Sequence, residues 1–165
     1  MAITKDKKKE IIADLKKILK DSKSVTFVNF HGLSVKDASE LRRSLKKENV
    51  GYLVTKKTLF GKALEAAGIE SVPKIEGEFS LAYLGESGID EIAPARGIYE
   101  FQKKLDGKVK IIGGIFDGGY KSEMEMTNIA RIPSLQMLRG MFVNIINSPV
   151  QRFVIGLNQI ALKSN

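Results

Sequence analysis

Residues 52–64 constrain the fold most, because the hydrophobic pattern changes its period within this stretch. Residues 52–54 form a short apolar run that is typical of a β-strand. The residues that follow repeat at the spacing of one helical face, and this apolar face consists of Leu59, Ala63, Leu64 and Ala67. A strand that passes directly into a helix needs a sheet to join and a core to cover. The stretch therefore predicts helices packed on a sheet.

Two adjacent lysines, Lys56 and Lys57, stand where this strand ends and the helix begins. Thr55 or Thr58 can cap the helix by accepting a hydrogen bond from a free backbone N–H. The free amides and the dipole of a helix N-terminus attract anions, and two ammonium groups beside them strengthen that attraction. We therefore expect a phosphate site here, with the backbone of a nucleic acid as its main candidate. The expected RNA contacts at this turn are Lys56, Lys57 and Thr58.

Positive charge is concentrated in the first part of the chain. Residues 1–62 hold 16 Lys+Arg and 7 Asp+Glu, a net charge of +9, whereas residues 63–165 hold 11 and 12, a net of −1; together these give the +8 of the whole chain. Localised lysines and arginines are typical of a surface that neutralises a polyanion. The alternative is a solvated, lysine-rich surface with no partner.

Two further predicted helices carry most of the other basic residues of this part. Residues 4–23 place apolar residues on one helical face and lysines on the rest. Lysines at a helix start oppose the helix dipole, so an external anion explains them better than helix stability does; a fraying basic arm is the alternative. A second helix begins after Ser34, which can act as its N-cap with Asp37 three residues later. The RNA contacts expected from these two helices are Lys5, Lys7, Lys8, Lys9, Arg42, Arg43 and Lys46.

Four apolar stretches predict strands, and helical patterns separate them. The predicted strands are residues 24–30, 52–54, 79–84 and 108–116. The helix that follows residue 58 is expected to end at Gly68, and another helix is expected at residues 89–105. This alternation favours an α+β fold in which helices pack on a small mixed sheet. We expect this domain to occupy residues 1–132.

From residue 133 to residue 165 the pattern becomes that of a long helical tail. Two apolar stripes, separated by Pro149 and offset by one residue, consist of Leu135, Leu138, Phe142 and Ile145, then Val150, Phe153, Leu157 and Ile160. Other apolar residues widen the arc, so the helix must be covered on several sides, by a partner or by its own domain. Polar residues such as Arg139 and Arg152 interrupt every span that a bilayer would require. Because no Asp or Glu follows Met126, an acidic partner is favoured.

Catalytic and metal chemistry finds little support in the sequence. Cysteine is absent and His31 is the one histidine, which alone makes neither a metal site nor a triad; we expect it in a turn or facing RNA. Residues 114–122 almost match the phosphate-binding loop of NTPases, but Tyr120 separates the last glycine from Lys121 and Ser122, so a glycine-rich turn is expected. No catalytic residue, metal or cofactor is predicted. The lack of cysteine and of a targeting segment predicts the cytoplasm.

Several motifs carry a resemblance to a known family. Phe30-x-Gly32-Leu33-Ser34, then Leu41-Arg42, then Val54-x-Lys56-x-Thr58-Leu59 resemble the bacterial stalk-base protein of the large ribosomal subunit, ribosomal protein L-ten. Pro94, residues 111–114 and residues 129–134 resemble later landmarks of that family. The chain departs from the family at Lys57, where Asn is usual, and at Glu78, where Pro is usual. A contact that needs an amide at position 57 is therefore not carried over.

The resemblance implies a ferredoxin-like sheet, binding to large-subunit rRNA at the stalk base, and a neighbouring stalk-base ribosomal protein. It also implies that the tail carries dimers of the acidic stalk protein, which in turn engage translation-factor GTPases. The resulting hypothesis is a non-enzymatic scaffold. Two rivals remain open: an RNA-modifying or nucleotide-using enzyme, and a free translational repressor that binds its own mRNA through the same basic surface.

Overall fold

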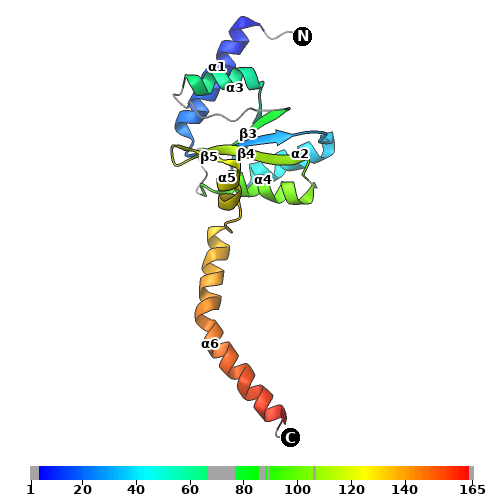
Figure 1. The fold of residues 1–165 in the computed structure, drawn as a ribbon, viewed down its shortest axis with the longest axis vertical. Coiled ribbons are helices and arrows are strands. Elements are labelled where there is room, and N and C mark those ends of the chain that lie inside the picture. The colour runs from blue at the N-terminus through cyan, green and yellow to red at the C-terminus, as the bar shows by residue number, and fades with distance from the viewer. Residues whose placement is uncertain (1–3, 67–76, 86–87, 89, 106, 164–165) are drawn as a thin grey trace. The chain divides into compact units, whose positions relative to one another are not determined.

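The described strands form one sheet with the order β2-β3-β1-β4-β5 (Figure 1). The computed structural model of the chain describes residues 4–66, 77–85, 88, 90–105 and 107–163. The strands are β1 (Ser24–Phe30), β2 (Val50–Val54), β3 (Phe79–Leu84), β4 (Val109–Phe116) and β5 (Gly119–Ser122). The first four coincide with the predicted strands within one or two residues at their ends, while β5 was not predicted. The predicted end of a helix at Gly68 lies outside the described residues.

Two crossover helices explain how these strands are ordered. Helix α2 (Val35–Lys47) joins β1 to β2 while β3 lies between them, and α4 (Ala93–Lys104) joins β3 to β4 while β1 lies between them. Strands joined by a crossover run parallel, and a strand inserted between them can be antiparallel to both. Every strand pair among the described residues is therefore antiparallel, whereas the sequence pattern had predicted a mixed sheet. The predicted α+β class is confirmed. The units β1-α2-β2 and β3-α4-β4 interleave as in the ferredoxin-like fold that the resemblance implied, with α3 added between β2 and β3.

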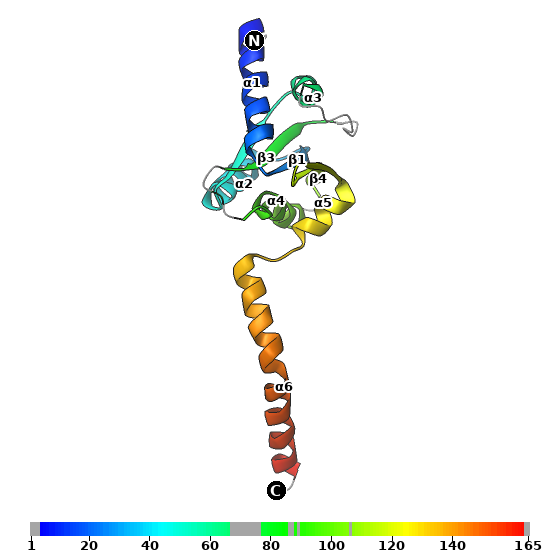
Figure 2. The same ribbon diagram turned by 90° about the vertical axis from the view of Figure 1, so that its left-hand side faces the viewer.

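Helices cover both faces of the sheet (Figures 1 and 2). Helices α1 (Lys5–Asp21) and α3 (Lys57–Glu65) lie side by side on one face, and α2, α4 and α5 (Glu123–Ala130) cover the other. The core under α1 and α3 includes Leu15, Phe27, Phe60, Leu64 and Leu81. The core under the other three helices includes Val28, Leu41, Ile98, Ile111 and Met126. Because successive strand residues point to opposite faces, central strands such as β1 supply both cores and are apolar along most of their length.

Helix α4 begins later than predicted. Its first residue is Ala93 rather than a residue near position 89, which lies outside the described residues. The Ile92 N–H donates to Asp90 Oδ1 at 3.1 Å, so these residues form a turn ahead of the helix. Pro94 then occupies the first helical turn, where its missing N–H costs nothing. The prediction began too early because the apolar spacing of the helix continues into the turn that precedes it, and this turn has its own hydrogen bond.

The chain divides into two compact units, Met1–Ile132 and Pro133–Asn165. The second contains helix α6 (Leu135–Lys163), which is 29 residues long and continues through Pro149. Pro149 lacks the N–H that would bond to the carbonyl of Ile145, so the helix loses one internal hydrogen bond at its middle. Within the described part of the chain, no helix is both long enough and apolar enough to span a membrane.

Candidate nucleic-acid interface and tail surface

The predicted passage from strand to basic turn to helix is confirmed. Strand β2 ends at Val54, and α3 begins at Lys57. Lys56, Lys57 and Thr58 are all exposed. The carbonyl oxygen of Lys56 accepts hydrogen bonds from the N–H groups of Leu59 at 3.0 Å and Phe60 at 3.1 Å, which holds the turn tightly against the helix. Both lysines therefore stand at the N-terminus of α3.

The predicted threonine cap of α3 is wrong. The N-cap is Lys56, with an extended backbone (φ −73°, ψ 130°) and no side-chain hydrogen bond to the helix. Thr55 precedes the cap position and Thr58 follows it by two residues, so neither hydroxyl occupies the place from which a cap accepts. A lysine cannot accept a hydrogen bond, and the first N–H groups of α3 are left without a capping side chain. These groups can bind an anion instead.

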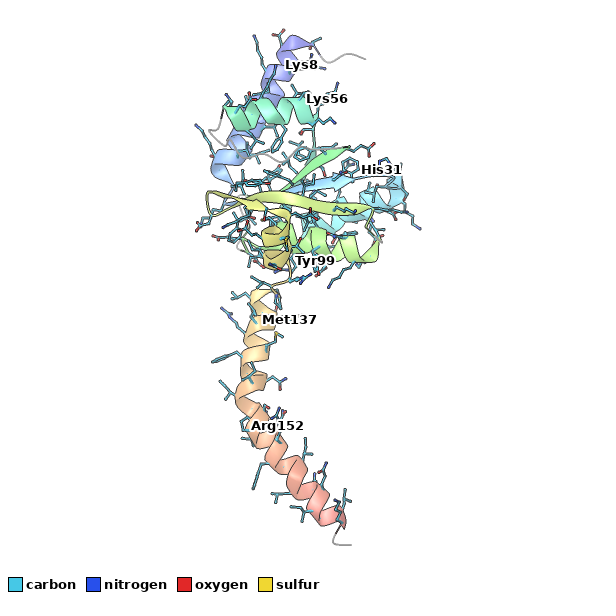
Figure 3. The ribbon with its side chains drawn as sticks, in the orientation of Figure 1. Lys8, His31, Lys56, Tyr99, Met137 and Arg152 are labelled. Carbon is cyan, nitrogen blue, oxygen red and sulfur yellow. The ribbon has the colours of Figure 1, made fainter. Side chains whose placement is uncertain are left out.

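The lysines of α1 lie near this turn. A hollow between α1 and the β2–α3 turn is lined by Ile11 of α1 and by Leu53, Lys56 and Leu59. Lys7 and Lys8 precede Ile11 by four and three residues, which places them on the same face of the helix, one turn earlier. Figure 3 shows Lys8 and Lys56 on the α1 and α3 side of the sheet. The helical spacing thus places Lys7 and Lys8 on the face of α1 that borders this hollow and the turn.

The remaining lysines that were predicted at the start of α1 are less informative. Lys9 is exposed and its Nζ lies 4.0 Å from Asp6 Oδ1, a weak surface pair between solvated groups. The side chain of Lys5 lies outside the described residues. Both positions stay predictions.

The basic residues of α2 are only partly joined to this region. The Arg42 guanidinium lies 5.8 Å from the ring centroid of Tyr52 on β2, the edge strand that leads to Lys56. Burial raises the pKa of the Tyr52 hydroxyl, and a hydrogen bond with Ser80 and the nearby Arg42 act in the opposite direction. Arg43 and Lys46 are exposed on α2, which covers the face opposite to α1 and α3. Arg42 therefore lies at the edge nearest the lysines, and the other two belong to a separate face.

His31 follows β1 in a turn. Its backbone N–H donates to the carbonyl of Lys108 at 3.0 Å, and Gly32 adopts a positive φ of 62° that a larger residue would resist. The side chain is exposed (Figure 3). Among the residues that the structure describes, no group of three or more His, Cys, Asp or Glu side chains is arranged to hold a metal ion.

The segment that resembles a phosphate-binding loop is a β-hairpin. Asp117 and Gly118 both have positive φ, 52° and 74°, and form the tight turn between β4 and β5. Asp-Gly is a strong signal for such a turn, and it would have predicted β5 had the two residues been weighed as a hairpin. Lys121 lies within β5, and the Ser122 hydroxyl caps α5 by accepting from the Glu125 N–H at 3.5 Å. The predicted glycine-rich turn is confirmed, and the Ser122 hydroxyl acts as the N-cap of α5.

A cluster that the sequence did not reveal lies where α4 and α5 end. Arg131 Nε donates to the Tyr99 hydroxyl at 3.2 Å, and Lys103 Nζ lies 4.6 Å from the centroid of the Tyr99 ring. Figure 3 marks the position of Tyr99 on α4. The hydrogen bond from Arg131 lowers the pKa of Tyr99, with smaller effects from the charges of Arg131 and Lys103. These residues are up to 32 positions apart, and each basic residue alone looks like an ordinary charge at a helix C-terminus.

The tail exposes a long apolar surface. None of the described residues of α6 is buried. The eight residues of the two predicted stripes are all exposed, from 39% for Leu138 to 70% for Ile145. Matching members of the stripes are 15 positions apart, so on this continuous helix the second stripe is rotated by roughly 60° from the first. An apolar surface of this length marks an interaction site.

The chain is similar over most of its length to known proteins. The family profile described as Ribosomal protein L10 matches residues 3–103 of the chain. Large ribosomal subunit protein uL10 of Fusobacterium nucleatum is 34% identical over 163 residues, covering 94% of each chain. The protein of that name from Shouchella clausii is 31% identical over 158 residues, 94% of this chain and 92% of that protein. The one from Rickettsia bellii is 31% identical over 146 residues, 88% and 83% of the two chains.

Proposed function

The chain belongs to the ribosomal protein L10 family, and from this premise we propose that it forms the base of the stalk of the large ribosomal subunit. As a member of this family it is a non-enzymatic structural component of that subunit and acts in translation. In the proposal, residues 1–132 bind large-subunit rRNA at the stalk base. Residues 133–165 carry dimers of the acidic stalk protein, which engage translation-factor GTPases. A neighbouring stalk-base ribosomal protein is the third expected contact.

The observation that carries the rRNA assignment is the uncapped N-terminus of α3 with Lys56 and Lys57 beside it. A helix end whose N–H groups have no side-chain partner is a site for an oxyanion, and phosphates are the oxyanions of RNA. Lys7 and Lys8 on α1 and Arg42 at the sheet edge extend the positive surface, so several phosphates could be contacted together. The net charge of +9 on residues 1–62 supports the same assignment.

The tail assignment is supported by the apolar surface of α6 and by its charge. Every stripe residue is exposed on a helix that cannot cover its own side chains. From residue 127 onward the chain has Arg131, Arg139, Arg152 and Lys163 but no Asp or Glu. Complementary charge steers an acidic partner toward such a helix, and the apolar stripes then supply the buried contact.

The rival function within the same class is a free translational repressor that binds its own mRNA. Both functions use the basic surface, so RNA binding by the isolated protein does not separate them. Co-sedimentation with large ribosomal subunits in high salt does. We expect the chain to remain with the subunits at salt concentrations that remove loosely bound basic proteins, because it is held by several contacts at once. Recovery only in the unbound fraction, with mRNA binding intact, would favour the repressor.

A further inference from the structure

The hollow between α1 and the β2–α3 turn has walls that do not suit a phosphate. It measures about 370 Å³, and its apolar lining comes from Ile11, Leu53, Val54 and Leu59. A phosphate is strongly hydrated and gains nothing from aliphatic walls. A flat, largely apolar ring with polar groups at its edge fits such a lining better. In RNA that group is a nucleobase, once it is free of its own stack.

The rim of the same hollow is basic. Lys56 lines it directly, and Lys7 and Lys8 lie one turn before Ile11 on the same face of α1. Lys56 also lines a second hollow on the other side of the turn, together with Lys57 and Thr58. A nucleotide whose base enters the first hollow would thus have its phosphates near these ammonium groups and near the free amides of α3. The arrangement of an apolar floor and a cationic rim matches a nucleotide as a whole.

One acidic residue also lines the hollow. Asp14 is exposed, and among the described residues its carboxylate makes no ion pair. A carboxylate repels a phosphate, but it accepts hydrogen bonds from the amino group of a base edge. Its position within a basic region therefore favours the base end of a nucleotide in this hollow over the phosphate end.

We propose that this hollow seats one unpaired base of the bound RNA, with its phosphates on Lys56 and the N-terminus of α3. The base carries an amino group that donates to Asp14, so adenine, guanine and cytosine are favoured over uracil. The proposal rests on the proposed rRNA-binding function and deepens it: the RNA target must present a loop or bulge, because a base within a duplex cannot enter.

The test uses the full chain and the large-subunit rRNA fragment from the stalk base, prepared with one unpaired nucleotide at a time lacking its base. Removal of a base leaves its phosphate in place. We expect one position at which this change weakens binding about 10-fold, as is usual for a single seated base. Ile11→Trp fills the hollow without altering charge and should weaken binding of the intact fragment by a similar factor. The affinity of the Ile11→Trp variant should be the same for the fragment with that base and for the fragment without it.

Ala13→Trp is the matched control, since Ala13 is exposed on another face of the same helix. It should bind like the unaltered chain. The proposal would be overturned if the two tryptophan variants bound the fragment with the same affinity. It would also be overturned if removal of the base were tolerated at every unpaired position. If the unaltered chain shows no salt-dependent binding to the fragment, the rRNA-binding function itself fails.

A second variant does not depend on how well the tryptophan is accommodated. Asp14→Asn removes the negative charge on an exposed side chain and should leave the thermal unfolding temperature unchanged. At the sensitive position, replacing the natural base by uracil should weaken binding several-fold for the unaltered chain and less for Asp14→Asn. The same uracil penalty in both proteins would refute the role of Asp14, and with it the identification of the hollow as a base site.

Discussion

At the scale of single residues, Lys56 illustrates a conflict between stability and binding. A lysine at an N-cap leaves helix amides unsatisfied and places a positive charge at the positive end of the helix dipole, so it destabilises α3 on two counts. A bound anion would accept hydrogen bonds from the free amides and would be attracted by the lysine charge, so both features favour binding. The residue is therefore better suited to the bound state than to the free one.

The conflict gives a prediction in which two measured quantities move in opposite directions. Lys56→Ser supplies a capping hydroxyl and should raise the free energy of unfolding by about 1 kcal/mol, a gain of a few degrees in Tm. The same change should weaken binding to the stalk-base rRNA fragment, because it removes a charge and occupies the free amides. Thermal unfolding and filter binding measure the two effects. A rise in both stability and affinity would contradict the anion-site interpretation.

The two lysines together should set part of the salt dependence of RNA binding. Changing Lys56 and Lys57 to Ala should weaken binding and flatten the plot of log affinity against log salt by about 0.9 for each lost duplex phosphate contact. The matched control changes Lys103 and Lys104 to Ala, which removes the same charge from α4 on the opposite face of the sheet. Equal slopes for the two variants would mean that the net charge, rather than this site, determines binding.

A third residue-scale prediction concerns stability alone. Arg96 is only 14% exposed, and its Nη2 lies 2.7 Å from Asp90 Oδ2 but 3.9 Å from Glu48 Oε2. Asp90→Ala should lower the free energy of unfolding by about 2 kcal/mol, because it leaves a largely buried guanidinium without its close partner and breaks the bond to the Ile92 N–H. Glu48→Ala, at the longer distance, should cost less than about 0.5 kcal/mol. Chemical denaturation of both variants tests the difference.

At the scale of helices and strands, local patterns predicted the elements better than their pairing. The helical spacing of Leu59, Ala63 and Leu64 and the apolar run of β1 depend only on neighbours in the chain, and both were predicted correctly. The antiparallel pairing was not, because the insertion of β3 between β1 and β2 is decided by how α2 crosses the sheet. The α3 cap was predicted wrongly because cap preferences favour threonine, whereas the structure places Lys56, a residue that cannot accept a hydrogen bond, at the cap position.

The residues of the candidate site were also predicted from local patterns, whereas their arrangement in space was not. The sequence placed Lys56 and Lys57 at a helix start, but it could not show that α1, which carries Lys7 and Lys8, packs beside α3. Nor could it show that α2 lies on the other face, which separates Arg43 and Lys46 from the lysines. Contacts between residues tens of positions apart depend on the sheet that positions both helices.

Within α6, the two stripes should act as separate binding segments. Changing Phe153 and Leu157 to Asp puts charges into a contact that must exclude water and loses about 1.5 to 3 kcal/mol of apolar burial at each position. Binding of stalk protein should be lost at the second segment and kept at the first. Changing Leu138 and Phe142 to Asp should instead abolish binding at the first segment and keep it at the second. Native mass spectrometry of the complexes reports the number of stalk chains bound.

The matched control for these variants adds the same two charges elsewhere. Gln151 and Asn158 are both exposed, and they lie roughly 130° around the helix from the centre of the second stripe. Changing both to Asp should leave the number of bound stalk chains unaltered. If the control loses as many chains as the stripe variant, added charge explains the loss and the stripes are not the contact.

At the scale of the whole molecule, the chain is expected to work as two units with separate tasks. Residues 1–132 contain all the strands that the structure describes. Helices cover both faces of this sheet, and a hydrophobic core lies under each set of helices. The second unit contains helix α6, and none of the described residues of this helix is buried. A unit with a core can fold alone, whereas a single helix with exposed apolar stripes needs a partner to cover them. This difference predicts what happens when the two are separated.

A chain that ends at Pro133 should stay folded, melt close to the temperature of the full chain and bind the rRNA fragment with unchanged affinity and salt slope. It should retain no stalk protein, because all eight stripe residues are gone. Thermal unfolding, filter binding and native mass spectrometry on the same preparation check the three statements. If the shortened chain melts much earlier or aggregates, while the stripe variants still bind a full complement of stalk protein, then the apolar face of α6 completes the first unit's core and the scaffold function of the tail is wrong.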